Sequence, residues 1–542
     1  MSYGIRHVHV LMFECVWCMA ISLIYLFHSF NLSSLRMNHN YENYVKHLQK
    51  ISDLNHSGAV LTWDQEVNMP EKGAQFRARQ LATLAGISHE MFTSEDFGML
   101  LQKLSIDQTL TFEESKNVEE SYRIYKRDKK FSIQFIEERS IAISNAFTAW
   151  ANAKEESNFS LFEPYLKKVV ENVRQESIII GFENHPYDAM LELYEPGMTT
   201  KELDQIFEQA KAKLIPLLQK IKQAKQVDDS FMYKQYDTEK QWNFGLDLLK
   251  QMHYDFDAGR QDISSHPFTI NFNPLDVRIT TRINEKDLAE MLWSTVHECG
   301  HALYEQGLKV ENYGLPSGEA TSLAMHESQS RLWENNVGRS YAYWKCNYAA
   351  LHEIFPKNLL MITVKDFYKA MNKVQASLIR TSADELTYHF HVIIRYEIEK
   401  DLIAGNIQVA DLPAVWNKKY KDYLGVDVPN DREGVLQDVH WSHGSFGYFP
   451  TYSLGSFYAV QFFNKANQEI ENLEGHISKG NMLPLLNWLR TNVHCYGKTY
   501  SASELCEKIT GEKLNIDHFI NYAYKKYSEI YELSSQYEPI SS

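Results

Sequence analysis

The sequence contains little cysteine, and this scarcity argues against a fold held together by disulfides. Six cysteines are spread over 542 residues at wide spacings that form no disulfide framework. Cys15 and Cys18 form a C-x-x-C pair, but no second pair of candidate metal ligands lies nearby in the chain. We therefore expect neither a zinc nor a redox site at this pair, and we expect the protein to work in a reducing compartment.

The chain also has fewer basic than acidic residues. The chain has 55 lysines and arginines against 70 aspartates and glutamates, which gives a formal net charge of -15 at pH 7. A surface for nucleic acid needs clustered positive charge, so we expect no nucleic-acid partner. The hydrophobic content of 44% and the aromatic content of 13% are ample for a large core.

The apolar segment near the N-terminus is too short for an ordinary membrane span. It runs from Cys15 to Phe27 and covers 13 residues, whereas a spanning helix needs about 20. It resembles the central part of a signal peptide, with Arg6 ahead of it, but no good cleavage site follows. Three interpretations of residues 1–36 are a mis-assigned start, an uncleaved anchor and a poor signal, of which we favour the first.

A second methionine, Met37, opens a sequence that is typical of a helical domain. The length would allow three to four average domains, but no internal repeat, low-complexity tract or break in composition divides the chain. We therefore assign residues 37–542 to one domain and expect a cytoplasmic protein without a membrane role. If residues 1–36 are translated, a membrane anchor or export would follow instead.

From Met37 onward, apolar residues recur with a helical period nearly throughout. The polar stretch from Gln226 to Gln241 is predicted to be a surface loop. In the first half of the chain, helical patterns cover Gly73–Phe92, Thr111–Ser157, Phe159–Ile180, Thr200–Val227 and Gln241–Met252.

The period changes to strand-like alternation at Ser265. Apolar residues alternate with polar ones over Phe268–Phe272 and again over Val277–Ile279, with Asn273-Pro274 as the turn between them. The fold class is therefore predicted to be mainly α, with a small β-sheet. An edge strand beside a site can hold an extended peptide through main-chain hydrogen bonds.

The segment from Leu292 to Gln306 contains the motif His297-Glu298-Cys299-Gly300-His301, which reads H-E-x-x-H. Residues four apart lie on one face of a helix, so His297 and His301 can direct both imidazoles at one metal ion. Glu298 can reach a water on that metal, and zinc suits such a set of ligands. The alternative is a buried helix whose two histidines make ordinary hydrogen bonds.

A third metal ligand is expected on a later helix, and Glu327 is the best candidate. It lies 26 positions beyond His301, the difference between 327 and 301, in a segment of helical pattern. Neighbours such as His326 and Arg331 suggest a polar surround for a ligand. Glu319 is a weaker candidate, and the alternative for Glu327 is a solvated helix face.

Two arginines are also singled out, although each has an ordinary interpretation as a member of an ion pair. Arg278 lies on the opposite strand face from Val277, and its alternative role is an ion pair with Asp276 or Glu290. Arg380 falls in a long helix predicted from about residue 365 to residue 403, where an ion pair four positions away with Asp384 is the ordinary interpretation.

Two histidines of the same predicted helix, His389 and His391, are not expected to bind metal. They are two positions apart, so a helix directs them to different faces.

The last informative segment begins at Gly434 and continues through glycines, prolines and aromatic residues to a helix predicted from Leu454. This composition is typical of a loop over a site. A purely structural loop is the alternative. The hydrogen-bonding side chains of the segment are Gln437, Asp438, His440, Tyr448 and Tyr452.

Taken together, these motifs resemble those of the carboxypeptidase Taq family, metallopeptidase family thirty-two. The resemblance runs from about Met37 to the C-terminal region and leaves out residues 1–36. Six motifs appear in order: His266-Pro267-Phe268, Asp276-x-Arg278-x-Thr280, His297-Glu298-x-x-His301, His326-Glu327-Ser328-Gln329, Ile379-Arg380-x-x-Ala383-Asp384 and Gly434-x-x-Gln437-Asp438-x-His440-Trp441.

The resemblance implies a saddle-shaped helical metallopeptidase of the zincin type with a deep groove, usually a homodimer. It implies zinc bound by His297, His301 and Glu327, with Glu298 as the general base, and cobalt as a possible substitute for zinc. The implied activity removes C-terminal residues from peptides with a free C-terminal carboxylate, with broad specificity and poor action at proline.

Further roles follow from the chemistry that such a reaction needs. Donors must stabilise the tetrahedral oxyanion, and His440 and Tyr452 are candidates because their offset resembles a His and Tyr pair in the thimet oligopeptidase group. Tyr448 is a near competitor. A cation must bind the substrate carboxylate, for which Arg380 is the first choice and Arg278 the second.

Two other functions remain open from the sequence. An oligopeptidase would cut inside peptides, as other helical H-E-x-x-H peptidases do. A catalytically idle metal-binding scaffold would keep the ligands without the reaction, although the intact Glu298 argues against it.

Overall fold

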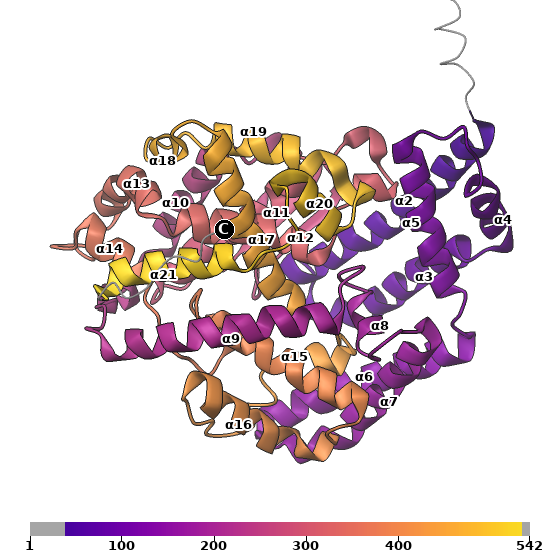
Figure 1. Ribbon diagram of the computed structural model, residues 1–542, viewed down its shortest axis with the longest axis horizontal. Helices are drawn as coiled ribbons and strands as arrows, with labels where there is room; N and C mark the ends of the chain where they lie inside the picture. Colours follow the sequence, from indigo (N-terminus) through magenta and orange to yellow (C-terminus); the bar gives the residue numbers. More distant parts are fainter. Residues whose placement is uncertain (1–37, 534–542) are drawn as a thin grey trace, which may run out of the picture.

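The computed structural model describes residues 38–533, so the apolar segment predicted at residues 1–36 lies outside the described residues. The described chain is mainly helical with one small sheet, and this confirms the predicted fold class (Figure 1). The helices before the sheet are α2 (His39–Val67), α3 (Ala74–Phe92), α4 (Glu95–Leu104), α5 (Phe112–Asp128), α6 (Ile133–Glu156), α7 (Glu163–Ile180), α8 (Asp188–Leu191), α9 (Thr200–Gln223) and α10 (Thr238–Gln251).

The H-E-x-x-H segment lies in the first helix after the sheet. A π-helical turn, Leu332–Gly338, follows α12 directly. The α-helices are α11 (Leu288–Glu305), α12 (Leu323–Arg331), α13 (Tyr341–Ile354), α14 (Val364–Met371), α15 (Tyr388–Ala404), α16 (Leu412–Leu424), α17 (Pro450–Glu469), α18 (Leu473–Ile477), α19 (Leu483–Asn492), α20 (Ala502–Thr510) and α21 (Asp517–Tyr531).

Helix boundaries in the first half follow local capping chemistry. The helical pattern predicted over Thr111–Ser157 divides into α5 and α6. Thr111 and Glu114 form a capping box at the start of α5, and the side chain of Ser132 caps α6. The other helices predicted in this half are present, with ends that shift by a few residues.

The sheet has three strands in the order β1-β3-β2. The predicted hairpin is present as β2 (Thr269–Asn273) and β3 (Asp276–Thr281), which pair antiparallel. Strand β1 (Gln261–Ile263) was not predicted, and it pairs parallel with β3. Three residues are too few for a recognisable alternation. Strand β2 is an edge strand of this sheet and packs against α11.

The long helix predicted over residues 365–403 is wrong. The chain forms α14, then an irregular segment with a short 3₁₀ turn at Arg380–Ser382, and then α15. Asp384 explains the break, because its carboxylate accepts hydrogen bonds from the backbone N–H groups of Gln375, Leu386 and Thr387. Aspartate side chains that bind nearby N–H groups in this way compete with helix formation.

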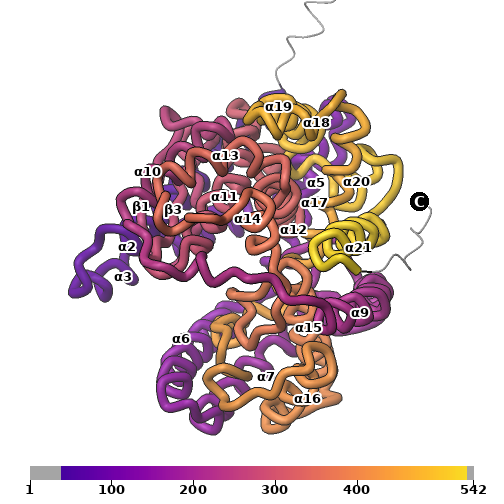
Figure 2. Tube along the Cα trace, turned by 90° about the vertical axis from the view of Figure 1, so that its left-hand side faces the viewer, coloured from indigo at the N-terminus to yellow at the C-terminus, as the bar shows by residue number. Residues whose placement is uncertain are grey.

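The helices gather around a large core and a smaller one. In Figure 2, α6, α7 and α16 lie together below the body that contains α11, α12 and α17. The smaller core lies under α2, α4 and α5 and includes Tyr44, Phe97 and Leu101. Within residues 38–533, no helix is both long and apolar enough to cross a membrane.

Two glycines permit the close approach of α11, α12 and α17. A Cβ atom on Gly300 would lie 2.6 Å from the Cα of Ser330 in α12. A Cβ atom on Gly455 would lie 2.6 Å from the Cβ of Glu327. Any larger residue would push these helices apart, so both glycines set the spacing at which the side chains of the three helices meet.

Candidate metal centre

Helix α11 carries both histidines of the H-E-x-x-H motif on the side that faces α12. The side chain of Asp287 accepts a hydrogen bond from the N–H of Ala289 and so caps the start of the helix. The ring centroids of His297 and His301 lie 4.9 Å apart, as expected for positions one turn apart.

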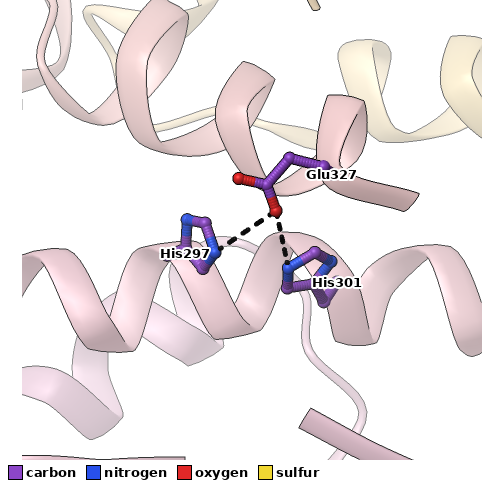
Figure 3. A group of neighbouring side chains, drawn as sticks. All are labelled: His297, His301 and Glu327. Carbon is purple, nitrogen blue, oxygen red and sulfur yellow. Dashed lines mark ion pairs between the residues drawn. The ribbon is translucent and has the colours of Figure 1, made fainter. Parts of the chain in front are cut away.

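Glu327 on α12 faces both histidines across a narrow gap (Figure 3). Its Oε2 lies 3.8 Å from Nε2 of His297 and 3.4 Å from Nε2 of His301. One ligand atom from each of the three residues lies within 4.8 Å of the other two. Two imidazole nitrogens and a carboxylate oxygen so placed are suited to hold one metal ion and leave a position open.

The carboxylate of Glu327 is fixed by an ion pair on its far side. Nε of Arg331 donates a hydrogen bond of 2.6 Å to Oε1, which leaves Oε2 directed at the histidines. Burial alone would raise the pKa of Glu327, but the charges of Arg331 and His297 outweigh it and hold this pKa well below its usual range. The carboxylate is therefore ionised at neutral pH, as a metal ligand must be.

The second histidine is kept neutral. Burial, with a contribution from His326, lowers the pKa of His301 to about 3. Its Nδ1 is buried without a hydrogen-bond partner among residues 38–533. Its other ring nitrogen, Nε2, faces Glu327.

Glu298 is held by the sheet. Its Oε2 accepts a hydrogen bond of 2.7 Å from the hydroxyl of Thr269 in β2, and this hydroxyl also lies 2.9 Å from the carbonyl oxygen of Glu298. Burial raises the pKa of Glu298 above its ordinary value, although His297 and the Thr269 hydroxyl act in the opposite direction. A fixed carboxylate with a raised pKa next to a metal site is suited to accept and return a proton.

His440, Tyr448 and Tyr452 lie together. The ring centroid of Tyr448 lies 5.4 Å from that of His440 and 5.3 Å from that of Tyr452. Burial lowers the pKa of His440 to about 4, and its buried Nδ1 has no partner in the described residues. Burial, with a smaller contribution from the charge of Glu327, raises the pKa of both tyrosines.

Arg380 does not pair with Asp384, as the sequence had suggested, but with Asp438. Its Nε and Nη2 lie 3.1 and 3.0 Å from Oδ1 of Asp438, and its Nη1 donates to the hydroxyl of Tyr388 at 2.9 Å. The helix that would align Arg380 with Asp384 is absent, so the two side chains do not share a helix face. Arg380 is buried, and its guanidinium carbon lies 5.0 Å from the ring centroid of Tyr452.

Arg278 forms the ion pair with Asp276 that the sequence offered as its alternative role. Its Nε and Nη2 each donate to the carboxylate of Asp276 at 2.9 Å. The guanidinium also lies over the rings of Trp63 and Phe272, at 4.5 and 4.8 Å from their centroids. About a fifth of the Arg278 side chain stays exposed, so it is the more accessible of the two arginines.

A pocket of about 610 Å³ adjoins the centre. Its wall includes Asn271 of β2 and His326, whose ring stacks on that of His301 at 4.4 Å between centroids. Glu319, the weaker candidate for a metal ligand, lines this pocket and binds Lys498 at 2.6 Å. Glu319 is therefore not among the three converging residues.

The structure also brings in two residues that the sequence analysis did not single out. Thr269 holds Glu298, and Glu334 lies 2.8 Å from Nδ1 of His297. Position 334 is seven residues beyond Glu327, a spacing that returns to the same helix face, so this periodicity could have indicated Glu334. No comparable pattern links Thr269 to the motif.

Comparison with known proteins covers nearly the whole chain. The sequence profile of the carboxypeptidase Taq (M32) metallopeptidases matches residues 43–527. Thermostable carboxypeptidase 1 of Thermus thermophilus is 40% identical over 504 residues, which cover 91% of this chain and 99% of that protein. Carboxypeptidase 1 of Bacillus subtilis is 39% identical over 498 residues, with the same two shares.

A solved structure agrees with the sequence comparisons. The crystal structure of the M32 carboxypeptidase from Deinococcus radiodurans is 36% identical, with a TM-score of 0.90, and the match covers 92% of this chain and 100% of that one. The fold, the family profile and the relatives agree, and the chain belongs to the carboxypeptidase Taq (M32) family of metallopeptidases, whose named members are carboxypeptidases.

Proposed function

We propose that this metallocarboxypeptidase is zinc-dependent and removes C-terminal residues from peptides that carry a free C-terminal carboxylate. The observation that carries the proposal is the convergence of His297, His301 and Glu327 within 4.8 Å, beside the buried carboxylate of Glu298. Broad specificity, with poor action at proline, is part of the proposal and rests on the family resemblance alone.

The donor set of the candidate centre fits zinc. Two imidazoles and one ionised carboxylate match a three-ligand catalytic site with an open position. A bound zinc ion supplies Lewis acidity, which lowers the pKa of water towards neutrality and polarises a carbonyl group. Cobalt, with similar ligand preferences, is expected to substitute for zinc.

Glu298 is the proposed general base. Its carboxylate takes a proton from the attacking water and afterwards delivers a proton to the leaving amine. The hydroxyl of Thr269 orients the carboxylate, and burial raises its pKa, which makes it a stronger base for the proton of the water. Both steps need one carboxylate that stays in place while its charge changes.

His440 and Tyr452 are the proposed donors to the tetrahedral oxyanion, with Tyr448 as the competitor. Burial keeps His440 neutral at pH 7, so one ring nitrogen carries a proton that it can donate. Both phenols keep their protons at neutral pH, since the ordinary pKa of tyrosine is 10 and burial raises it further. Fixed donors of this kind stabilise a developing negative charge more strongly than mobile water does.

Arg380 remains the first choice for the substrate carboxylate. Asp438 is in direct contact with two guanidinium groups, those of Arg380 and Arg395, so these three side chains sum to one positive charge. A buried cluster with an excess positive charge favours an anion. Arg278 is the second choice, because its pair with Asp276 leaves no such excess.

Two further expectations concern the setting of the enzyme. We propose a homodimer in the cytoplasm, as the family resemblance and the scarcity of cysteine suggest. Sedimentation of the purified protein at several concentrations would measure the dimer, and fractionation of cells would measure the location.

The direct test compares a free-acid peptide with its C-terminal amide, each with and without a chelator. We expect stepwise loss of residues from the free acid alone, which chelation abolishes and added zinc or cobalt restores. Internal cuts in both peptides would support an oligopeptidase instead. Metal binding without cleavage of either peptide would support an idle scaffold.

A further inference from the structure

The two histidines of the candidate centre are held in different ways. Nδ1 of His297 lies 2.8 Å from Oε2 of Glu334, whereas Nδ1 of His301 has no partner among residues 38–533. An ionised carboxylate only accepts hydrogen bonds, so the proton of the His297 ring must lie on Nδ1. The lone pair on Nε2 of His297 then faces Glu327, where a metal ion needs it.

Glu334 is fixed by an unusual local geometry. It lies in the π-helical turn Leu332–Gly338, where the N–H of Arg339 donates to the carbonyl of Glu334 five residues earlier. Nη2 of Arg339 also donates to Oε1 of Glu334 at 2.9 Å, so the turn brings both side chains together. Glu334 is 5% exposed, and both of its carboxylate oxygens have hydrogen-bond partners.

Arg331 connects Glu334 to the third ligand. Its Nη1 donates to Oε2 of Glu334 at 3.1 Å, and its Nε donates to Oε1 of Glu327 at 2.6 Å. With Arg339, the group contains two carboxylates and two guanidinium groups, and its formal charge is zero. Loss of the Glu334 charge would leave an excess positive charge beside the place of a cation.

We propose that Glu334 is a positioning residue that orients His297 for zinc and sets the affinity of the centre for the metal. This inference rests on the proposed zinc site. It predicts that metal binding depends on a residue that touches neither zinc nor substrate.

The test measures the zinc dissociation constant by competition with a coloured chelator at fixed pH. Carboxylates that hold a ligand histidine typically contribute about 10- to 100-fold to metal affinity. Glu334→Gln keeps an acceptor oxygen but loses the charge, so we expect zinc affinity to fall about 10-fold. Glu334→Ala loses both, and we expect a fall of about 100-fold.

Two matched variants separate this role from general effects. Glu305→Gln removes the charge from a neighbouring pair in which the carboxylate lies 2.8 Å from Nε2 of His326, which is not a proposed ligand. Glu176→Gln changes a buried carboxylate of α7 that pairs with Arg139. This pair lies outside α11 and α12, the helices of the candidate centre. We expect wild-type zinc affinity in both. Far-UV circular dichroism and thermal unfolding of the metal-free forms would check that each variant folds.

Activity gives a second measure. At saturating zinc, Glu334→Gln should regain most of its kcat with little change in KM, because the defect lies in metal binding.

Each outcome has one meaning. Wild-type zinc affinity in Glu334→Gln, or an equal loss in Glu305→Gln, would overturn the role of Glu334 and leave the zinc proposal intact. If the wild-type protein binds no zinc, the proposed function itself fails. Glu334→Gln preserves the shape of the side chain, so it decides the question even if Glu334→Ala does not fold.

Discussion

Two of the buried charge clusters within residues 38–533 differ in their net charge. The first joins Glu327 and Glu334 to Arg331 and Arg339, and its charges cancel. The second cluster consists of Asp438 between Arg380 and Arg395, which sum to one positive charge.

This difference in net charge suits the two clusters to ions of opposite charge. In the proposed function, the balanced cluster orients ligands for a cation without opposing it. The unbalanced cluster is proposed to accept one more anion, the substrate carboxylate. Arginine is suited to both tasks because its planar fork can bind two partners at once.

The largest expected effect comes from the first cluster. Glu327→Ala removes a proposed ligand and leaves Arg331 facing the histidines, so we expect no bound metal and activity at the background level. Elemental analysis of the purified variant beside the wild type would measure the metal. A full equivalent of zinc in the variant would show that Glu327 is not a ligand.

The next effect separates metal binding from proton transfer. Glu298→Gln keeps the ligands and the neighbouring hydroxyl of Thr269 but cannot accept a proton, so we expect bound metal and a rate lower by about 10²- to 10⁴-fold. Elemental analysis and steady-state kinetics would check both. Turnover close to that of the wild type would remove Glu298 as the base.

The second cluster should respond differently. Arg380→Ala should raise KM for free-acid peptides by roughly 10- to 100-fold, the cost of losing a charge-assisted hydrogen bond, with much less effect on binding of amidated peptides. Asp438 keeps Arg395 as a partner, so we expect the variant to fold. Arg278→Ala is the matched variant. If only Arg278→Ala discriminates between acid and amide, the assignment moves to that residue.

The smallest expected effect concerns stability rather than turnover, and it comes from a buried carboxylate that lies in neither cluster. Glu399 on α15 accepts hydrogen bonds from the ring nitrogen of Trp441, the N–H of Gly447 and the hydroxyl of Tyr187. Burial raises its pKa from the ordinary 4.5 to about 7. Its folded form therefore binds a proton more tightly than the unfolded chain does.

The sign of the pH dependence follows from that shift. The contribution of Glu399 to stability is complete below about pH 4.5 and is lost as the pH rises through 7. Relative to Glu399→Gln, the wild type should lose up to about 3 kcal/mol of unfolding free energy between pH 4.5 and pH 8. Denaturant titrations at several pH values would measure it, and a constant difference between the two proteins would contradict the prediction.

The sequence predicts the candidate metal ligands better than the partner of Arg380, for a physical reason. His297, His301 and Glu327 lie on helices whose side-chain period is fixed, so local spacing indicates which residues share a face. The helical class and the β2–β3 hairpin follow from the same kind of local pattern. In these regions the local sequence pattern agrees with the structure.

Arg380 illustrates what local pattern misses. The side chain of Asp384 ends the predicted helix through bonds to backbone N–H groups, and Arg380 instead meets Asp438, 58 positions later. No period within one segment specifies such a partner. The same limit applies to Thr269, which reaches Glu298 from a separate strand, and to β1, which is too short to carry a pattern.

The closeness of α11, α12 and α17 at Gly300 and Gly455 also has a kinetic consequence. Where helices are in contact at a glycine, local opening of one helix requires displacement of its neighbours. We therefore expect the amide hydrogens around these contacts to exchange with deuterium only when the whole molecule unfolds. On this view the metal ligands lie in the slowest-exchanging unit of the protein, and the centre stays assembled until the fold itself is lost.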